Sequence, residues 1–328
     1  GKPGMYNQGN RRTGTGASHA RRRLKTLEEV NIMAGYWGKL LGVDLSAGSL
    51  EDVALEEQVC RDFIGGAGVA ARLLLDRLDP DREPLHPDSP LYIMAGPLTG
   101  SRVVGAATRF TVAGVSPLTG IWGESSCGGS FGVQLRRNGY DGIVITGRAP
   151  SPMALVMIDG ACELMDAADL WGLDTYELTH TLKARIKERD GKSASVLGIG
   201  PAGENRVRFA CLMNDGHNAA GRCGFGALLG AKNLKALAAW GGRKPQFADP
   251  DSLDTLRDEL KGKADSNIAV SSMAAFGTNG GMDLGSMSGD VPIKNWTQGA
   301  WDEGIDKLNG PAMSGTILTK NKACFGCT

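Results

Sequence analysis

The sequence lacks several features that would assign it quickly to a class. Its 36 lysine and arginine residues balance 36 aspartate and glutamate residues, so net charge favours neither nucleic acid nor an anionic membrane as a partner. No apolar run approaches the ~18 residues of a transmembrane helix. No Gly-x4-Gly-Lys-Ser/Thr phosphate loop occurs. The seven cysteines, odd in number and scattered, do not form the pattern of a disulfide framework and indicate a reducing cytoplasm.

Two compositional features mark out regions of the chain. Glycine supplies 48 of the 328 residues, about twice its average share and without a collagen period, which indicates many tight turns. Residues 1–32 are polar and contain the runs Arg11-Arg12 and Arg21-Arg22-Arg23. A twin-arginine export signal needs an apolar segment of about 7–15 residues after such a pair, and none follows. We therefore interpret 1–32 as a disordered or mis-assigned basic leader.

Two glycine-rich stretches, Leu91–Gly147 and Ala194–Gly241, follow the same plan. In each, an apolar strand runs into a Gly-Pro pair, a second strand follows, and a polar glycine cluster precedes a Phe-Gly pair and a further strand. The expected strands are Leu91–Ala95, Arg109–Val115 and Gly142–Thr146, then Ser195–Ile199, Val207–Met213 and Ala236–Trp240. Without a gap, Asn138–Ile143 aligns with Lys232–Leu237. The sequence therefore predicts a diverged internal duplication, whose halves would pair about a pseudo-two-fold axis.

The glycine clusters, Ser125–Gly129 and Ala219–Gly224, are the candidate ligand-binding segments. Glycine permits positive φ and has no Cβ, so successive N–H groups can form an anion-binding concavity. Arg109 and Arg222 are the arginines best placed by sequence to add a planar fork for phosphate oxygens. Each cluster alone is also compatible with a tight turn in a β-rich domain. Their matching places in a duplication favour a phosphate-bearing ligand.

A formal dinucleotide fingerprint also occurs, as Gly66-x-Gly68-x-x-Ala71. It opens an expected helix that ends at Asp79-Pro80 and places Leu74, Leu75 and Leu78 on one face. In a nicotinamide-dependent dehydrogenase the fingerprint follows a buried parallel strand, whereas Glu56–Asp62 is too charged for one. The sequence therefore disfavours a dehydrogenase, which stays an alternative.

The remaining elements are expected at the two ends and in the middle. They are a hairpin of Leu40–Leu45 and Ser49–Leu55, a strand over Met153–Asp159, a helix over Asp174–Arg189 capped by Asp174 and ended by Gly191, and a helix from Asp249-Pro250 with Leu253, Leu256 and Leu260 on one face. Residues 271–290 are too irregular to assign. The change of character near 242–248 predicts two domains, 33–243 and 244–328.

A Cys-x-x-Cys pair, Cys324-Phe325-Gly326-Cys327, lies near the end of the sequence. Two thiolates so spaced can share an iron–sulfur cluster or a zinc ion, form a redox disulfide, or remain free thiols. Either metal site needs further ligands, and none follows. We interpret the chain as a fragment.

Taken together, these residues resemble the N-terminal part of the tungsten-containing aldehyde ferredoxin oxidoreductase family. The matching pieces cover about 34–328 in order: Gly35–Lys39, Ala95–Gly100, Ser116–Gly120, Gly139–Asp141, Ile199–Asn205, Met213–His217, Ala219–Arg222, Lys232–Ala236, Lys294–Trp296 and Cys324 with Cys327. The resemblance implies an α+β fold with a two-sheet pterin-binding domain, followed by the start of a mostly helical domain. It also implies tungsten or molybdenum held by two pterins, a [4Fe–4S] cluster, and room for a magnesium ion bridging the pterin phosphates.

Site residues follow from the resemblance by matching positions. Pterin contacts are expected from Arg109, Ser126, Gly128 and Gly129 in the first half, and from Asn218, Ala219, Gly221 and Arg222 in the second. Ser126 stands where asparagine is common and Asn218 where arginine is common, and the missing arginine would weaken one phosphate contact. Cys324 and Cys327 would be the first two cluster ligands. Further ligands and the catalytic residues would lie beyond Thr328, so no catalytic residue is assigned. Glu124 is interpreted as a surface carboxylate and His217 as a hydrogen-bonded core histidine.

The resemblance implies oxidation of a small aldehyde to a carboxylic acid, with electrons passed to ferredoxin or to an iron–sulfur partner subunit. Nucleic acid and membrane are not expected as partners, and a homo-oligomer is left open. Two alternatives remain. One is a reductase of the same family that acts on an aromatic thioester or an oxo acid, and the other is a truncated pterin-binding domain without catalysis.

Overall fold

The computed structural model describes residues 33–105, 107–321 and 323–324. Its strands form two mixed six-stranded sheets. The first sheet has the order β2-β1-β6-β3-β4-β5 and consists of β1 (Lys39–Asp44), β2 (Ser49–Ala54), β3 (Leu91–Ala95), β4 (Phe110–Val115), β5 (Trp122–Cys127) and β6 (Gly142–Thr146). The second, read from β8, has the order β8-β7-β12-β9-β10-β11 and consists of β7 (Met153–Ile158), β8 (Ala161–Asp166), β9 (Ser195–Gly198), β10 (Leu212–Asn214), β11 (Asn218–Ala220) and β12 (Leu234–Trp240).

The strand register confirms the predicted duplication. Both sheets have one parallel pair, β1 with β6 and β7 with β12, while their other pairs are antiparallel. One row of neighbouring residues across the first sheet is Val53, Leu40, Gly142, Met94, Thr111 and Ser126. The equivalent row across the second is Met165, Ala154, Ala236, Gly198, Met213 and Ala219. Gly142 and Ala236 occupy the same column, as the gap-free sequence alignment predicts, and the repeat also includes the hairpins β1–β2 and β7–β8.

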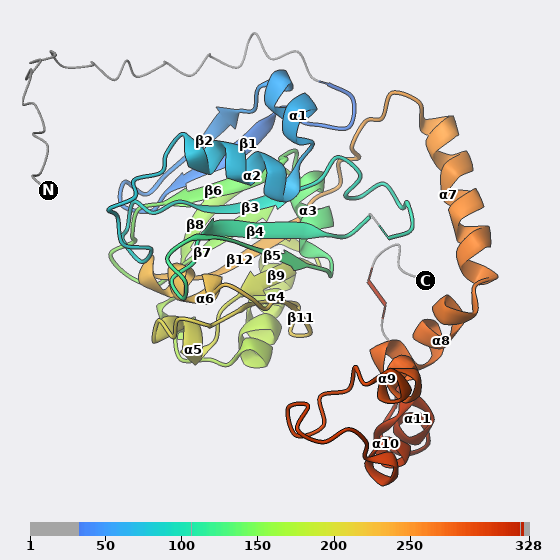
Figure 1. Cartoon of the computed structure of the whole chain (residues 1–328). Helices are drawn as coiled ribbons and strands as arrows, with labels where there is room; N and C mark the ends of the chain where they lie inside the picture. The colour runs from blue at the N-terminus through green and yellow to red at the C-terminus, as the bar shows by residue number, and fades with distance from the viewer. Residues whose placement is uncertain (1–32, 106, 322, 325–328) are drawn as a thin grey trace, which may run out of the picture.

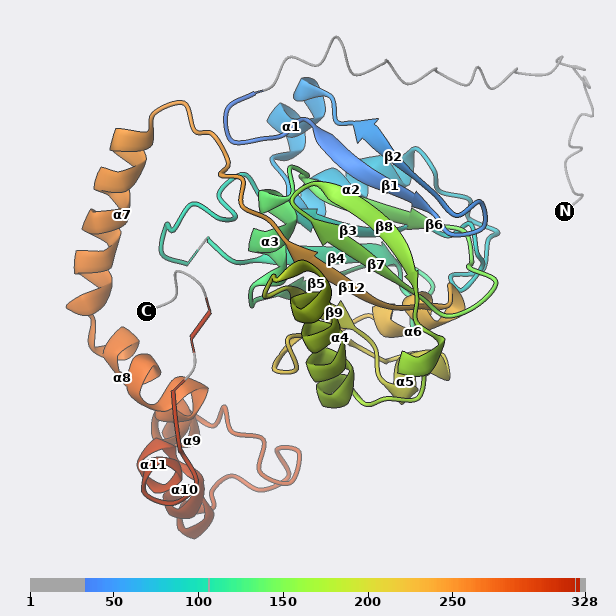
Figure 2. The same ribbon diagram turned by 180° about the vertical axis from the view of Figure 1, so that it is seen from behind.

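The helices divide into those that cover the sheets and those that follow them. In the sheet domain they are α1 (Glu57–Phe63), α2 (Gly66–Leu75), α3 (Phe131–Arg137), α4 (Thr175–Asp190), α5 (Pro201–Glu204) and α6 (Phe225–Ala231), with the short 3₁₀ helix η2 (Ala168–Leu170). After β12 come α7 (Pro250–Asp265), α8 (Ile268–Phe276), the 3₁₀ helix η3 (Gly277–Gly281), α9 (Met282–Ser288), α10 (Asp302–Leu308) and α11 (Gly310–Thr316). These later helices lie beside the two-sheet body in both views (Figures 1 and 2).

Three buried clusters explain why the central strands are apolar throughout. The largest lies between the sheets and combines side chains such as Ile93 and Ile143 of the first with Leu197 and Leu237 of the second. A second cluster joins the outer face of the first sheet to α1 and α2, and a third joins the outer face of the second sheet to α4. Successive side chains of a strand point to opposite faces, so strands covered on both sides bury every residue. β3, with all five residues buried, is such a strand.

Several expectations need correction. The strand expected over Val207–Met213 is only β10, because Val207–Ala210 form a turn after Arg206, whose φ is 56°. Of the leucines placed on one face of α2, Leu74 is buried but Leu75 is 67% exposed, and Leu78 lies past the end of the helix. The unassigned stretch 271–290 contains most of α8, then η3 and α9. α7 forms where predicted, yet none of its residues is buried.

Candidate functional site

The two glycine clusters lie at the ends of β5 and β11, the outermost strands of their sheets, which contact each other. Ser125, Ser126 and Cys127 belong to β5 itself rather than to a loop. Every second residue of β5 is exposed, so Glu124 and Ser126 share its open face while Ser125 and Cys127 face inward. Ser126 and Ala219 occupy equivalent columns of the two sheets. The duplication therefore brings two equivalent edges together at one place.

Hydrogen bonds tie the two edges to the C-terminal cysteine. The Gly129 N–H donates to Cys324 Sγ at 3.2 Å, although the residues are 195 apart in sequence, and Asn218 Nδ2 donates to the same sulfur at 3.6 Å. Between the edges, the Arg222 N–H donates to Ser125 Oγ at 3.2 Å. The candidate site is thus a junction of three segments: the first cluster, the second cluster and the segment that carries Cys324.

Close approach requires glycine at Gly129 and leaves little room for a side chain at Gly128. A Cβ on Gly128 would lie 3.3 Å from Cys324 Sγ and 3.4 Å from Asn218 Nδ2. Gly129 has a φ of 92°, and its Cβ would overlap Asn214 Oδ1. Glycine supplies the missing space and the left-handed conformation at once. At Gly221 a Cβ would meet only Ala219 Cβ, at 3.9 Å, so space is open there, whereas at Gly224, whose φ is 76°, a Cβ would overlap the Arg208 carbonyl oxygen.

Asn214 is a site residue that the sequence did not single out. Its side chain is fully buried; Nδ2 donates to Ser195 Oγ at 3.0 Å and to the Val196 carbonyl at 3.0 Å. Its Oδ1 accepts from the Phe131 N–H at 3.3 Å, so this one amide connects the second sheet to the turn after Gly129. A polar side chain in a buried strand is the only sequence signal that could have indicated it.

The electrostatics of the site leave two arginines available. Arg109 and Arg222 are exposed, and neither guanidinium forms an ion pair with a carboxylate in the described parts of the chain. Cys127 is fully buried, and burial raises the pKa of its thiol to about 12, against the opposing influence of Arg109. Cys127 is therefore an uncharged core thiol at neutral pH. The site thus has two exposed guanidinium groups, those of Arg109 and Arg222, and a neutral buried thiol, that of Cys127.

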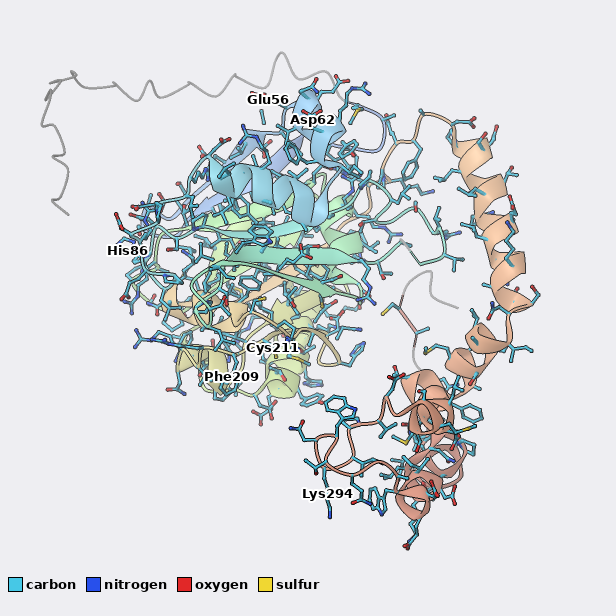
Figure 3. The ribbon with its side chains drawn as sticks, in the orientation of Figure 1. Glu56, Asp62, His86, Phe209, Cys211 and Lys294 are labelled. Carbon is cyan, nitrogen blue, oxygen red and sulfur yellow. The ribbon has the colours of Figure 1, made fainter. Side chains whose placement is uncertain are left out.

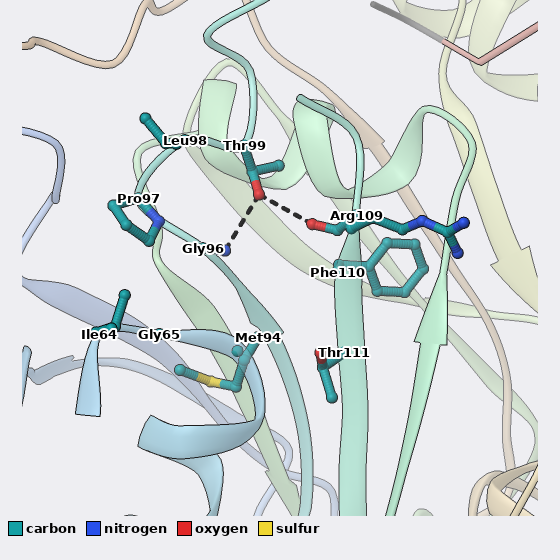
Figure 4. Close-up of a pocket in the computed structure, with 11 residues that line it drawn as sticks. Ile64, Gly65, Met94, Gly96, Pro97, Leu98, Thr99, Arg109, Phe110 and Thr111 are labelled. Carbon is teal, nitrogen blue, oxygen red and sulfur yellow. Dashed lines mark hydrogen bonds between the residues drawn. The ribbon is translucent and has the colours of Figure 1, made fainter. Parts of the chain in front are cut away.

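A pocket of about 310 Å³ lies where β3 ends and β4 begins, on the side of α2, and Arg109 is among its lining residues (Figure 4). It lies between the start of α2 at Gly65-Gly66 and the Pro97-Leu98 turn. Thr99 Oγ1 shapes its wall by accepting from the Gly96 N–H at 3.1 Å and donating to the Arg109 carbonyl at 2.9 Å. The Arg109 side chain extends away from the Pro97 side of the pocket (Figure 4).

The other sequence predictions have mixed outcomes. Glu124 is exposed, as expected of a surface carboxylate, but the core assignment of His217 is wrong, because it is exposed with Nδ1 2.6 Å from the Asp215 carbonyl oxygen. The charged segment before the dinucleotide fingerprint, which includes Asp62, forms helix α1 rather than a strand, so a dinucleotide fold is excluded there (Figure 3). Cys327 lies outside the described residues.

Within 33–105, 107–321 and 323–324, no three His, Cys, Asp or Glu side chains are grouped to hold a metal ion. In the same residues, every helix is too short or too polar to span a bilayer.

Comparison with known proteins agrees with this architecture. The family profile of the aldehyde ferredoxin oxidoreductase N-terminal domain matches residues 40–241, and the profile of domains 2 and 3 matches residues 255–328. The tungsten-containing aldehyde ferredoxin oxidoreductase of Pyrococcus furiosus is 36% identical over 296 residues, which are 90% of this chain and 48% of that protein. The WOR-like subunit of an aliphatic sulfonate oxidoreductase from the same organism is 34% identical over 310 residues, again 90% of this chain and 48% of the relative.

A solved structure, the active-site complex BamBC of benzoyl coenzyme A reductase with 1,5-dienoyl-CoA, matches with a TM-score of 0.67 and 34% identity over 71% of this chain and 35% of that chain. The chain spans about half the length of the curated relatives it matches. Two equivalent sheets joined at a glycine-lined edge, and a profile match over most of the described fold, assign this chain to the aldehyde ferredoxin oxidoreductase family.

Proposed function

We propose that this chain is the pterin-binding portion of a tungsten or molybdenum enzyme that oxidises aldehydes to carboxylic acids. Electrons would leave through a [4Fe–4S] cluster to ferredoxin or to an iron–sulfur partner subunit. The observation that carries the proposal is the junction of two equivalent glycine-rich edges beneath Cys324, each edge with one exposed arginine beside it. A symmetric pair of ligands, one for each half, fits that arrangement.

The residues present suit two phosphate-bearing pterins. Arg109 and Arg222 are exposed and free of carboxylate partners among the described residues, so both guanidinium groups are available to a phosphate. Open backbone at Gly221 allows a flat ring to approach without meeting a side chain. The proposed contacts are Arg109, Ser126, Gly128 and Gly129 from one half, and Asn218, Ala219, Gly221 and Arg222 from the other. A magnesium ion between the two phosphates is part of the proposal.

Cys324 suits a role as a cluster ligand. Its sulfur receives two N–H donors, and such donors stabilise the negative charge of an iron–sulfur cluster. We propose Cys324 and Cys327 as the first two cluster ligands. When bound, the metal–pterin group would supply two-electron redox chemistry, by which an aldehyde and water give a carboxylic acid, two electrons and two protons. The described residues would bind and orient that group at the junction of the sheets, where Asn214 Oδ1 accepts from the Phe131 N–H at 3.3 Å and fixes the turn after Gly129.

A different substrate within the family is the second candidate. The benzoyl coenzyme A reductase complex, with a TM-score of 0.67, is named for an aromatic thioester, and the aliphatic sulfonate oxidoreductase subunit is named for a different substrate again. Reduction of an aromatic thioester or of an oxo acid therefore stands beside aldehyde oxidation.

Elemental analysis of the native full-length protein, purified without air, tests the cofactor assignment. Tungsten or molybdenum near one per chain, about four irons and two pterin phosphates would support it, with an intact mass to fix the length of the chain. A full-length protein made in a competent host without metal or pterin would contradict it and leave a non-catalytic domain. Turnover of short aldehydes with a viologen dye, compared with viologen-driven reduction of aromatic thioesters or oxo acids, would separate the substrates.

The partners and the compartment are also proposals. We infer a cytoplasmic protein with ferredoxin or an iron–sulfur subunit as its electron acceptor. Recovery of the native protein from a cytosolic fraction together with ferredoxin or an iron–sulfur subunit would support both inferences. Reduction of ferredoxin by that protein in the presence of aldehyde would support the electron acceptor. Recovery of the protein in a membrane fraction, or electron transfer to nicotinamide alone, would contradict them.

A further inference from the structure

Cys324 Sγ accepts hydrogen bonds from both halves of the duplication. The Gly129 N–H donates to it from the first half at 3.2 Å, and Asn218 Nδ2 donates to it from the second half at 3.6 Å, while the Cys324 thiol donates to Asn218 Oδ1 at 3.9 Å. Gly128 leaves the space for the sulfur, because a Cβ there would be 3.3 Å away. No side chain other than Asn218 donates to this sulfur in the described residues.

Asn214 supports the turn that carries the Gly129 N–H. Its Oδ1 accepts from the Phe131 N–H and lies next to Gly129, at the position that a Cβ would occupy. Its Nδ2 donates to Ser195 Oγ and to the Val196 carbonyl of the second sheet. Every polar atom of this buried amide is used. The Gly129 N–H is therefore fixed in direction by a rigid support, and Asn218 lies opposite Asn214 in the β10–β11 register.

The two halves differ at this position. In the second sheet, one row of neighbouring residues runs from Asn218 through Asn214 to Leu197. The equivalent row of the first sheet runs from Ser125 through Val112 to Ile93, so Ser125 is the equivalent of Asn218. Ser125 Oγ accepts from the Arg222 N–H at 3.2 Å. The two equivalent positions therefore make different contacts. Ser125 bonds across the junction between the sheets, and Asn218 donates to the Cys324 sulfur.

We propose that Asn218 is a positioning residue for Cys324 that raises the reduction potential of the cluster this cysteine would bind. The inference deepens the proposed function and rests on it. An N–H donor directed at a cluster sulfur stabilises the reduced cluster more than the oxidised one, because reduction adds a negative charge. The side-chain amide of Asn218 is engaged with the sulfur, so its contact with a pterin is made by the backbone.

Three variants of the full-length holoenzyme test the assignment. Asn218→Asp replaces the donor by an acceptor of the same shape with a negative charge, and Asn218→Ala removes the donor without adding charge. Gln58→Glu is the matched amide-to-acid control, because Gln58 lies on α1, on the outer face of the first sheet, and its Nε2 donates to Asp62 at 2.8 Å. The measurement is the midpoint potential of the reduced cluster signal in an anaerobic redox titration followed by electron paramagnetic resonance.

Asn218→Asp is expected to disfavour the reduced cluster about tenfold, which is about 59 mV for a one-electron couple. Asn218→Ala should act in the same direction by about threefold, and Gln58→Glu should leave the potential unchanged. An exchangeable-proton coupling to the cluster should also disappear in both Asn218 variants, which a merely structural role would not cause.

The outcomes separate this inference from the function beneath it. A wild-type holoenzyme without an iron–sulfur signal would overturn the proposed function. A wild-type cluster whose potential and proton coupling are the same in both Asn218 variants would overturn the role of Asn218 alone. Loss of the cluster from both variants, with native circular dichroism, would overturn it too, because a contact that only tunes the potential is not needed for assembly.

Discussion

At the scale of single residues, the site depends on atoms that are absent as much as on those present. Gly128 and Gly129 lie where a Cβ would meet the Cys324 sulfur or the Asn214 amide. The sequence indicates such a cluster through its glycine content, but the object approached by the backbone cannot be read from it. Here part of that object is Cys324, 195 residues from Gly129 in sequence.

Gly129→Ala is expected to destabilise the protein by about 3 kcal/mol, through a non-glycine residue at a φ of 92° together with overlap at Asn214 Oδ1. Urea unfolding of this chain, followed by circular dichroism, measures the change. Gly48→Ala is the matched control, because Gly48 has a φ of 65° but nothing within 4 Å of its Cβ position. It should cost only the backbone strain, about 1 kcal/mol. Equal losses in the two variants would show that the Asn214 contact contributes nothing.

Lys232 offers a residue-scale prediction about pH. Its ammonium is buried and donates to the Pro87 carbonyl at 2.5 Å and the Gly147 carbonyl at 3.4 Å, and it forms no ion pair with a carboxylate among the described residues. Burial lowers the pKa of this lysine from 10.5 to about 8. Between these two values the unfolded chain binds a proton that the folded chain does not. The free energy of unfolding therefore gains a rising contribution as pH increases through this window.

Lys232→Met removes that contribution. Relative to the variant, the wild type should gain about 1–2 kcal/mol between pH 7.5 and pH 9.5, at about 1.4 kcal/mol for each pH unit between the two pKa values. Unfolding in urea at several pH values measures the difference. The absolute loss from the unsatisfied Pro87 and Gly147 carbonyls is independent of pH, so the slope is the test. A difference that stays constant over this range would contradict a depressed pKa for Lys232.

At the scale of elements, prediction succeeded where burial and local signals agree. β3 and β6 form over the residues expected, because apolar runs bounded by turns are buried on both faces. β5 was missed as a strand because its sequence, WGESSC, is polar on its open side, as an edge strand allows. The Phe-Gly pairs begin the short helices α3 and α6, whose buried residues come from packing between the sheets rather than from helical periodicity.

Helix α4 provides the element-scale prediction. Asp174 accepts from the Tyr176 N–H at 2.8 Å and the Glu177 N–H at 2.9 Å, and the Glu177 side chain accepts from the Asp174 N–H at 3.2 Å, which completes a capping box. Asp174→Ala should lower the free energy of unfolding by about 1 kcal/mol. Glu188→Ala, an exposed change later in the same helix, should stay within about 0.5 kcal/mol. Chemical unfolding of both variants measures the contrast, and equal effects would remove the cap as the cause.

At the scale of the whole molecule, the halves keep one architecture while their side chains diverge. Asp141 and Lys235 are equivalent in the gap-free alignment, and each is buried in an ion pair, the first with Arg136 and the second with Glu204. The sign of the charge is reversed, yet a paired charge is kept at the same place. Asp141 also accepts from the Trp37 and Gly38 N–H groups, so this pair fixes the segment that enters β1. Divergence of this kind hides the duplication from composition but not from strand register.

The paired edges give a prediction for the whole assembly. If each half holds one pterin of a single metal group, Arg109→Ala and Arg222→Ala should lower tungsten or molybdenum occupancy to a similar extent. Each variant loses a charge-assisted contact to phosphate worth about 1.5–3 kcal/mol, so affinity should fall by about tenfold or more. The pterin-to-metal ratio should stay near two, because the metal group is held or lost as a unit.

Arg185→Ala is the control for this experiment, because Arg185 is paired with Asp169 on the surface, and its loss should leave occupancy unchanged. Metal analysis and fluorescence of the oxidised pterins, on full-length protein, give occupancy and ratio together. Loss of one pterin with the metal retained in Arg109→Ala, but not in Arg222→Ala, would mean that the two edges bind independent ligands. The equivalent positions of Ser126 and Ala219 in the two sheets would then reflect only the duplication of the fold, and the two edges would not form one binding site.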